Sequence, residues 1–280
     1  TGVFDGQGHS ISGYQPVDNG GAGLFAVNHG TIRNLAVEDA DVDTSAGTVG
    51  LLVDFNSGEI ENSWTSGAIA GASRVGGVVG DSTGSVTDTY STADVRSRST
   101  EAGGVVAVAI EGSTTQRVYS TGNVTSDTRN VGGIIGYGYE GTGLHNAISL
   151  NESVTAPSYA HAMLGRVRSG DNPDLSGLLA SDASYVSVES LTDEPAEDNW
   201  KGRVVAADST QSQELYVEDL GWDFDSTWLW DDGAQRPVLQ VNPEEYQAQQ
   251  PAGEPNADGY YEIASAEELE QITKYPDEQY

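Results

Sequence analysis

Apolar residues recur along the chain in short runs, and the runs repeat at a nearly constant spacing. The stretch from Val75 to Val95, VGGVVGDSTGSVTDTYSTADV, is echoed from Val131 to Leu150 by VGGIIGYGYEGTGLHNAISL. Alignment of the second position of each glycine pair gives anchors 26 to 29 residues apart, at Gly23, Leu51, Gly77, Gly104, Gly133 and Ala162. A fixed period of this length predicts a repeat architecture with one structural unit per copy.

Two further columns keep the same period. One holds Ile32, Ile60, Val86, Thr115 and Leu144, and the other, four positions later, holds Ala36, Trp64, Tyr90, Tyr119 and Ile148. Within each copy, short β-branched runs alternate with Gly, Ser, Asn and Asp, and the periodicity of a helix is missing. The pattern predicts an all-β fold, a parallel β-solenoid with about 26 to 29 residues per coil and coils stacked at ~4.8 Å.

Stacking makes specific predictions for the columns. Val78, Val105 and Ile134 should form a ladder that points into the solenoid, and the bulky column should form a second one. The glycines should lie where a side chain would strike the next coil or where φ is positive. A polar column of Asn34, Asn62, Asp88, Arg117 and Asn146 predicts side chains that bond along a ladder. A polar binding stripe is the alternative interpretation of this column.

The repeat also suggests how the chain is divided. We expect regular coils over residues 1–168, an irregular closing region over 169–241, a linker over 242–259, and the start of a following module or a capping helix over 260–280. Ser265 and Glu268 form a capping box that predicts a short helix with Leu269 and Ile272 on one side. A second short helix is predicted over 210–220, where Thr210 and Gln213 have capping spacing.

The predicted helix at the chain's end has an apolar side that needs a partner. We name Phe4, Leu269 and Ile272 as candidate assembly residues, through which the chain would meet a second copy or a tandem neighbouring module. The alternative is a tail produced by an arbitrary cut.

The charge of the chain limits the kinds of partner that it can bind. The chain has 12 Lys and Arg against 43 Asp and Glu, a formal net charge of −31. Binding to nucleic acid or to an anionic membrane surface is therefore excluded, and such an acidic surface predicts a salt-loving source. The absence of cysteine excludes disulfides and thiolate metal sites, and no apolar stretch approaches the ~20 residues needed for membrane insertion.

The sequence offers little for catalysis, and we predict no catalytic residue, no metal site and no cofactor. Asp5 and His9 flank a glycine-rich turn in which Asp5 can bond nearby amides. His29, His145 and His161 fall at different places in their copies. Acidic pairs such as Asp231–Asp232 and Glu244–Glu245 lack the spacing of calcium loops.

Two glycosylation sequons occur in predicted turns, where a glycan could project. They are Asn123-Val124-Thr125 and Asn151-Glu152-Ser153.

Three segments carry a family resemblance. The opening TGVFDGQGHSISGY, the VGGVVG copies and LGWDFDSTWLWDDGAQRPVLQV (220–241) together resemble the GLUG-motif repeat proteins of bacteria and archaea. The resemblance implies a right-handed β-helix and an extracellular, cell-surface location, and it implies no catalytic residue. The final segment DGYYEIASAEELEQITKY (258–275) resembles the part that precedes a phrase such as FDGQGHSI in this family.

Together these features favour a non-enzymatic structural or adhesive module of an extracellular surface protein or filament, assembled end to end through its terminal segments. The alternative is a carbohydrate-binding or polysaccharide-cleaving β-helix, with a surface polysaccharide as partner and a groove lined by Trp222, Trp228 and Trp230. We expect these tryptophans instead to close the last coil, beside Pro237. Carboxylates converging within ~5 to 10 Å at a groove would favour glycoside chemistry. A viral fibre segment is a third interpretation.

Overall fold

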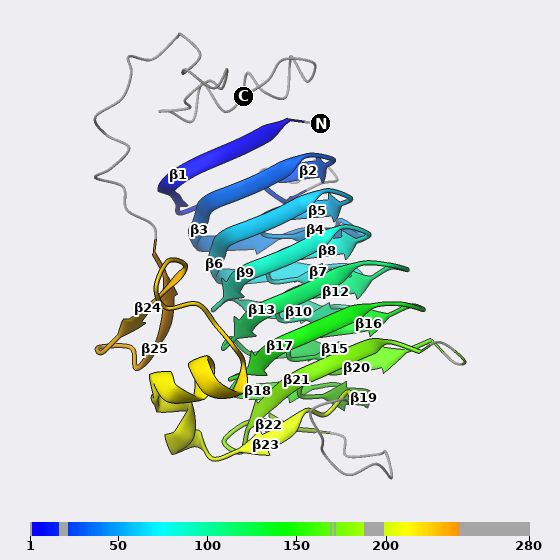
Figure 1. Ribbon diagram of the computed structural model, residues 1–280. Coiled ribbons are helices and arrows are strands. Elements are labelled where there is room, and N and C mark those ends of the chain that lie inside the picture. Colours follow the sequence, from blue (N-terminus) through cyan, green and yellow to red (C-terminus); the bar gives the residue numbers. More distant parts are fainter. Residues whose placement is uncertain (1, 17–21, 169, 171, 188–198, 241–280) are drawn as a thin grey trace, which may run out of the picture.

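The protein is a parallel β-solenoid, as the repeat predicts. A computed structural model describes residues 2–16, 22–168, 170, 172–187 and 199–240. Successive copies of the repeat lie above one another as coils, and the N-terminal strand occupies one end of the stack (Figure 1). A segment near the C-terminus leaves the stack and runs along its side (Figure 1).

The largest sheet has twelve strands and contains two strand segments from most coils. Its first row is β1 (Val3–Ser12), β3 (Thr31–Asp43), β6 (Glu59–Gly71), β9 (Ser85–Ser91), β13 (Thr114–Ser120), β17 (Gly143–Ser149), β21 (Asp174–Ser181) and β23 (Arg203–Val205). Its second row continues from the long strand β6 through β10 (Asp94–Ser97), β14 (Val124–Ser126), β18 (Ser153–Thr155) and β22 (Tyr185–Val186).

Two smaller parallel sheets complete each coil. The five-stranded sheet contains β4 (Thr48–Gly50), β7 (Arg74–Gly76), β11 (Glu101–Gly103), β15 (Arg129–Gly132) and β19 (Ser158–His161). The six-stranded sheet contains β2 (Phe25–Asn28), β5 (Val53–Asn56), β8 (Val79–Ser82), β12 (Val106–Ala109), β16 (Ile135–Gly138) and β20 (Leu164–Val167). The glycine pairs of the repeat form the corner between these two sheets.

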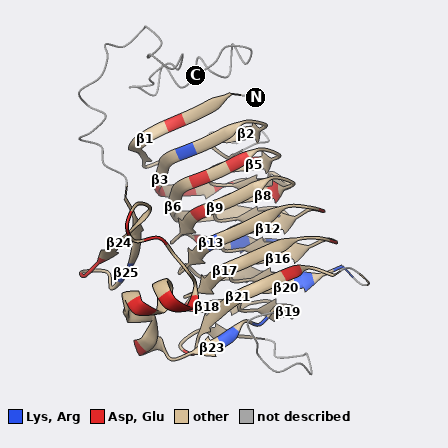
Figure 2. Cartoon of the chain, in the orientation of Figure 1, with Lys and Arg blue, Asp and Glu red and all other residues tan. Residues whose placement is uncertain are grey.

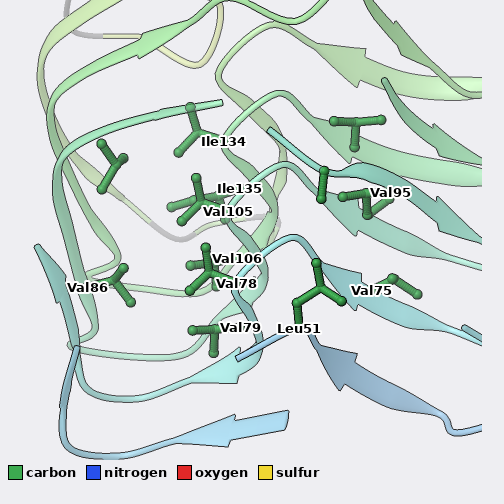
Figure 3. Packing of buried hydrophobic residues seen from close by; sticks show 14 of the residues in the cluster. Leu51, Val75, Val78, Val79, Val86, Val95, Val105, Val106, Ile134 and Ile135 are labelled. Atoms are coloured by element: carbon green, nitrogen blue, oxygen red, sulfur yellow. The ribbon is translucent and has the colours of Figure 1, made fainter. Parts of the chain in front are cut away.

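The strand register confirms the columns that the sequence predicts. One ladder runs without a shift through Phe4, Ile32, Ile60, Val86, Thr115, Leu144 and Leu175. Val78, Val105 and Ile134 are fully buried, and the amide of each of the first two donates to the carbonyl of the next. Figure 3 shows these side chains stacked inside the solenoid with Leu51, Val79 and Val106.

The anchor glycines are required by close packing between coils. A Cβ atom on Gly104 would lie 2.0 Å from the carbonyl oxygen of Gly133, and one on Gly77 would lie 2.1 Å from that of Gly104. Neither residue has a positive φ. The first of the two predicted reasons, collision with the next coil, therefore applies at this column.

The polar column has a different explanation from the glycine column: its residues have a left-handed backbone conformation. Asn34, Asn62, Asp88, Arg117 and Asn146 all have φ between 47° and 53°. Asn and Asp adopt this conformation more readily than other residues with side chains. Side chains bond along the column in part, since Arg117 donates from Nε and Nη2 to the Asp88 carboxylate at 2.7 Å each.

The left-handed residue also corrects one prediction. Four positions separate Thr115 from Tyr119, so strict alternation would place both inside. The extra residue Arg117 interrupts the alternation, and Val118 points into the core while Tyr119 belongs to a separate hydrophobic cluster. The bulky column of Trp64, Tyr90, Tyr119 and Ile148 therefore lies on the outer face of the large sheet, and it forms no second interior ladder.

Stacking continues beyond residue 168, although the glycine pair is absent there. β21 pairs with β17 in register over Asp174–Ala180, and β23 pairs with β21. The chain then leaves the sheet and forms what we call the strap, residues 207–240. The strap contains a 3₁₀ turn η1 (Ala207–Gln211), a π-helical turn η2 (Leu215–Asp219), and an antiparallel hairpin of β24 (Trp228–Asp231) and β25 (Arg236–Leu239).

The helix predicted over 210–220 is only partly as expected. Thr210 lies inside the first turn, where its hydroxyl donates to the carbonyl of Ala207 at 2.7 Å, so it does not cap a following helix. Glu214 occupies the N-cap of η2 and makes no side-chain capping bond.

Candidate functional site

The N-terminal end of the stack is an apolar cross-section of the solenoid, and we call it the N-terminal end face. Phe4 and Phe25 are only partly buried and contact each other with ring centroids 5.0 Å apart. The next residues in their columns, Ile32 and Val53, are 3% and 0% exposed. Burial is thus complete one coil below the end and incomplete at the end itself.

Strand edges at this end also lack a second partner within the described part of the chain. Among the described strands, β1 pairs only with β3, β2 only with β5, and β4 only with β7. Open edges of parallel strands can accept further strands, and repeat proteins usually cover their terminal units. The exposed side chain of Val27, at the edge of β2, adds apolar surface.

A buried carboxylate fixes the coil beneath the end face. Asp54 accepts hydrogen bonds from the amides of Gly23 at 2.9 Å, Ala22 at 3.3 Å and Gly50 at 3.3 Å. Burial raises the pKa of Asp54 despite these three donors. Tyr14 donates to the carbonyl of Gly23 at 3.2 Å, and burial raises the pKa of its phenol. These bonds hold the start of β2 in place, so the end face is well defined.

The core at the opposite end is covered in part by Trp200. Leu164 in the last strand of the six-stranded sheet donates to the carbonyl of Trp200 at 3.0 Å, and the Trp200 side chain packs against the core. Its ring lies 6.4 Å from that of His161, whose Nδ1 is 2.7 Å from the carbonyl oxygen of Gly165. Burial lowers the pKa of His161. Trp200 thus covers the core at the C-terminal end. The strand edges at that end stay unpaired among the described strands, because β19, β22 and β23 each pair with one strand.

Of the three residues predicted to take part in assembly, only Phe4 lies in the described part of the chain. Phe4 lies in the N-terminal end face. Leu269, Ile272 and the capping box at Ser265 lie outside the described residues, as do the whole predicted linker and the whole segment 260–280.

The tryptophans of the strap do not close the last coil, which corrects a second prediction. Trp222 and Trp228 are 2% and 0% exposed, and they stack on each other with ring centroids 4.4 Å apart. Trp228 packs beside Tyr90 and Tyr119, on the side of the stack. Because both tryptophans are buried, they are not available to line a sugar-binding groove.

Polar bonds fix the strap in register with particular coils. Trp228 donates through Nε1 to Asp88 at 3.1 Å, and Trp222 donates to the carbonyl of Asn146 at 2.9 Å. Tyr119 donates to the carbonyl of Pro237 at 2.8 Å. Burial raises the pKa of Tyr119 well above its usual value, so the phenol stays a donor. The left-handed column therefore has a second role as the attachment row for the strap.

A charged network at the corner between the two smaller sheets escaped sequence analysis. Arg74 donates to Asp81 at 2.6 Å across the glycine corner, and Asn130 donates to Glu101 at 3.0 Å in the neighbouring coils. Burial raises the pKa of Asp81, with Arg74 acting in the opposite direction. The one available signal was an Arg and an Asp placed symmetrically around Gly-Gly-Val-Val. Asp81 is only 5% exposed, so the network seals the corner and offers no open site.

The catalytic and metal interpretations receive no support from geometry. Asp5 accepts from Gln7 N and Asn34 Nδ2 at 2.9 Å and from Arg33 Nε at 2.8 Å, which confirms that it bonds nearby amides. No group of three or more His, Asp or Glu side chains able to hold a metal ion occurs within the described ranges.

One arrangement has the composition of a hydrolytic triad without its geometry. Ser176 Oγ lies 2.8 Å from Nδ1 of His145, and Asp174 Oδ2 lies 3.8 Å from Nε2. The Asp174 side chain is 80% exposed, so it cannot orient the imidazole as a buried carboxylate would. The three residues occupy adjacent coils on the surface of the large sheet.

The two sequons differ in access. Asn151 is 1% exposed, and its Nδ2 donates to Gly122 O at 2.7 Å and to Ser120 Oγ at 2.5 Å. A glycan on this atom would require the coil to open, so the expected projection from a turn does not hold at Asn151. Asn123 is partly exposed and donates to Asp94 at 3.1 Å, and its glycosylation stays a prediction.

Acidic residues outnumber basic ones in the described part of the chain. Figure 2 shows Asp and Glu on strands such as β1, β6 and β9 and on the helical part of the strap, and Lys or Arg on β3, β20 and β23. The described residues contain no helix long and apolar enough to cross a membrane.

Comparisons with known proteins give two likenesses. No family model matches the chain, so the similarity to GLUG-motif proteins stays a resemblance. A stretch of 88 residues is 41% identical to halomucin of Haloquadratum walsbyi, and it covers 30% of this chain and 1% of halomucin. A crystal structure described as a putative immunoglobulin A1 protease from Bacteroides ovatus aligns with a TM-score of 0.72, at 20% identity, over 85% of this chain and 77% of that one. The structural likeness shows the fold alone.

Proposed function

We propose that this chain is a non-enzymatic structural module of an extracellular surface protein, and that it assembles end to end. The observation that carries the proposal is the partly exposed apolar core at the N-terminal end face. Trp200 covers part of the core at the C-terminal end, while Phe4 and Phe25 remain partly exposed beside open strand edges in the described part of the N-terminal end. An apolar end face with open edges is stable when another segment covers it.

The segment we propose as the cover is residues 260–280 of a second copy or of a preceding module. Its predicted helix would present Leu269 and Ile272 to the N-terminal end face. Burial of apolar side chains stabilises such a contact by roughly 25 cal/mol per Å². Contact between the tail of one unit and the head of the next generates an open, head-to-tail chain in which all units point the same way.

The proposed surface location rests on charge and on similarity. A net charge of −31 keeps a protein soluble in concentrated salt, where screening weakens its self-repulsion. The halomucin match comes from a halophilic archaeon and agrees with that setting. A rigid rod of stacked coils would act there as a spacer and as an adhesive contact.

Complementary variants test the proposal directly. In concentrated KCl, the wild-type chain should sediment as a concentration-dependent series of oligomers. Phe4→Asp should remove the acceptor face, and the double variant Leu269→Asp/Ile272→Asp should remove the donor segment, so each should sediment as a monomer. A mixture of the two should form heterodimers and nothing larger, because one intact interface remains per pair. Deletion of residues 243–280 should also abolish association.

The matched control is Val217→Asp, which places a charge on an exposed apolar residue of the strap, away from the N-terminal end face. It should associate like the wild type. Circular dichroism checks that Phe4→Asp keeps the fold. A wild-type chain that stays monomeric at high concentration, or a mixture that does not associate, would overturn end-to-end assembly.

A further inference from the structure

The strap is held to the coils by a hydrophobic cluster of its own. Tyr216, Leu220, Trp222, Trp228 and Leu239 pack on a row of outward side chains from the large sheet, namely Tyr90, Tyr119, Ile148 and Leu179. This row spans consecutive coils, since its members pair in register from β9 to β21. The strap therefore crosses several coils on the outside of the stack.

The solenoid core is complete without the strap. The interior cluster is formed by residues from Ala22 to Ala180, and no strap residue is among its buried members. The large sheet separates this cluster from the outer one. Loss of the strap would thus uncover the outer aromatic row and leave the interior packing unchanged.

The strap is joined to the coils through side chains. Its hairpin, β24 and β25, is a two-stranded sheet separate from the three sheets of the solenoid. Trp228 to Asp88, Trp222 to Asn146 and Tyr119 to Pro237 are hydrogen bonds that anchor it on the outer face. Arg203 donates to Asp219, and the Ala207 amide donates to Asp182, where the strap leaves the last coil. Side-chain contacts along an outer face can be broken one after another, whereas the backbone ladders of the coils are continuous between strands.

Chain order puts the strap in the path of any tension. It lies between the last coil strand, β23, and residues 241–280. If residues 260–280 hold a neighbouring unit, a pull from that neighbour reaches β25 before it reaches a coil.

We propose that the strap is a releasable length of chain that yields under tension while the solenoid stays folded. This inference rests on the proposed function, because only a module joined to neighbours bears such a load. Release of residues 207–240 would extend the chain by about 115 Å at full extension. When the tension is removed, the strap would pack again on the outer aromatic row of Tyr90 and Tyr119, because this packing buries the exposed rings.

Single-molecule pulling tests the proposal. The chain has no cysteine, so cysteines added at its two ends give unique attachment points on the full-length protein. We expect a first, low-force event of about 115 Å of contour length, followed at higher force by unfolding of the coils. Tyr119→Phe, which removes the bond to Pro237, should lower the force of the first event and leave the second unchanged. Val105→Ala, in the core, should lower the force of the second event and leave that of the first unchanged.

An equilibrium experiment uses the positions of the tryptophans. Trp64, Trp222, Trp228 and Trp230 belong to or contact the outer cluster, and Trp200 packs on the core. In a Trp64→Phe/Trp200→Phe chain, the remaining tryptophans all lie in the strap, so fluorescence reports the strap, and far-ultraviolet circular dichroism reports mainly the strands. Fluorescence should change at a lower urea concentration than circular dichroism. Tyr119→Phe should shift the fluorescence transition alone.

The inference would be overturned if the fluorescence and circular dichroism transitions coincided and Tyr119→Phe shifted both equally. A single pulling event for the strap and the coils together would also overturn it. Both experiments use isolated chains, so their outcome is independent of whether copies associate. A releasable strap in a chain that stays monomeric would refute end-to-end assembly alone.

Discussion

At the residue scale, backbone conformation decides more of the pattern than side-chain chemistry does. The polar column from Asn34 to Asn146 could be taken from sequence for a binding stripe, yet its members share a left-handed backbone. That conformation adds one residue to the strand and turns the following side chains to the other face. The aromatic row and its strap therefore depend on a few residues with positive φ.

Substitution of Asn62 tests this requirement. Asn62→Ala should lower the free energy of unfolding by about 1 to 2 kcal/mol, because alanine pays the full cost of φ near 47°. Asn62→Gly should stay within about 1 kcal/mol of the wild type, since glycine adopts positive φ freely. Urea unfolding measures both. If the alanine variant matched the glycine variant, the left-handed account of the column would be wrong.

At the element scale, each corner and each ladder is set by the coil above and below it. Parallel stacking places equivalent residues in contact, so the sequence repeats the same type of residue at each level. This is why the period, the interior ladder and the collision at the glycines could be predicted. The direction of the bulky column could not be predicted, because the strict alternation of strand side chains does not hold across the left-handed residue.

Gly104 offers a second test at this scale. Gly104→Ala should lower the free energy of unfolding by about 2 kcal/mol or more, since its Cβ would meet the Gly133 carbonyl at 2.0 Å. Gly47→Ala is the matched control: a Cβ there has no neighbour within 4 Å, and φ is not positive. It should change stability by less than about 0.5 kcal/mol. Equal effects of the two substitutions in urea unfolding would refute the packing explanation.

At the scale of the whole molecule, the solenoid and the strap are two layers joined across one sheet. Trp228 and Asp88 are 140 residues apart, and nothing periodic in the sequence connects them. The resemblance of the Trp-rich segment to the end of a family domain indicated that it belongs to the module, but not where it packs. The bond between Arg74 and Asp81 could not be predicted from the repeat either, because the equivalent positions of neighbouring coils do not contain the same pair.

The buried carboxylates predict an unusual pH dependence. Burial raises the pKa of both Asp54 and Asp81. The folded chain then binds these protons more tightly than the unfolded chain, so their contribution to stability is full below the ordinary carboxyl pKa near 4 and is lost as pH rises through the raised values. In concentrated KCl, which screens surface repulsion, the urea midpoint should fall between about pH 4 and pH 7.

Asp81→Asn should make this fall smaller, because one of the two carboxyls no longer titrates. Asp127→Asn, at an exposed position, is the control and should leave the slope unchanged. A midpoint that rises over the same range, or an unchanged slope in Asp81→Asn, would contradict the assignment of the pH dependence to these groups.

The central claim is that the open N-terminal end of one unit receives the C-terminal segment of another. A spin-label distance measurement tests it most directly, with one population labelled at a cysteine replacing Val27 and a second at a cysteine replacing Glu268. Mixed in concentrated KCl, the two should give a narrow, short intermolecular distance that disappears when Phe4→Asp is added to the first population. The claim would be contradicted if the mixture gave no dipolar coupling, or if coupling arose only when both labels were in one chain.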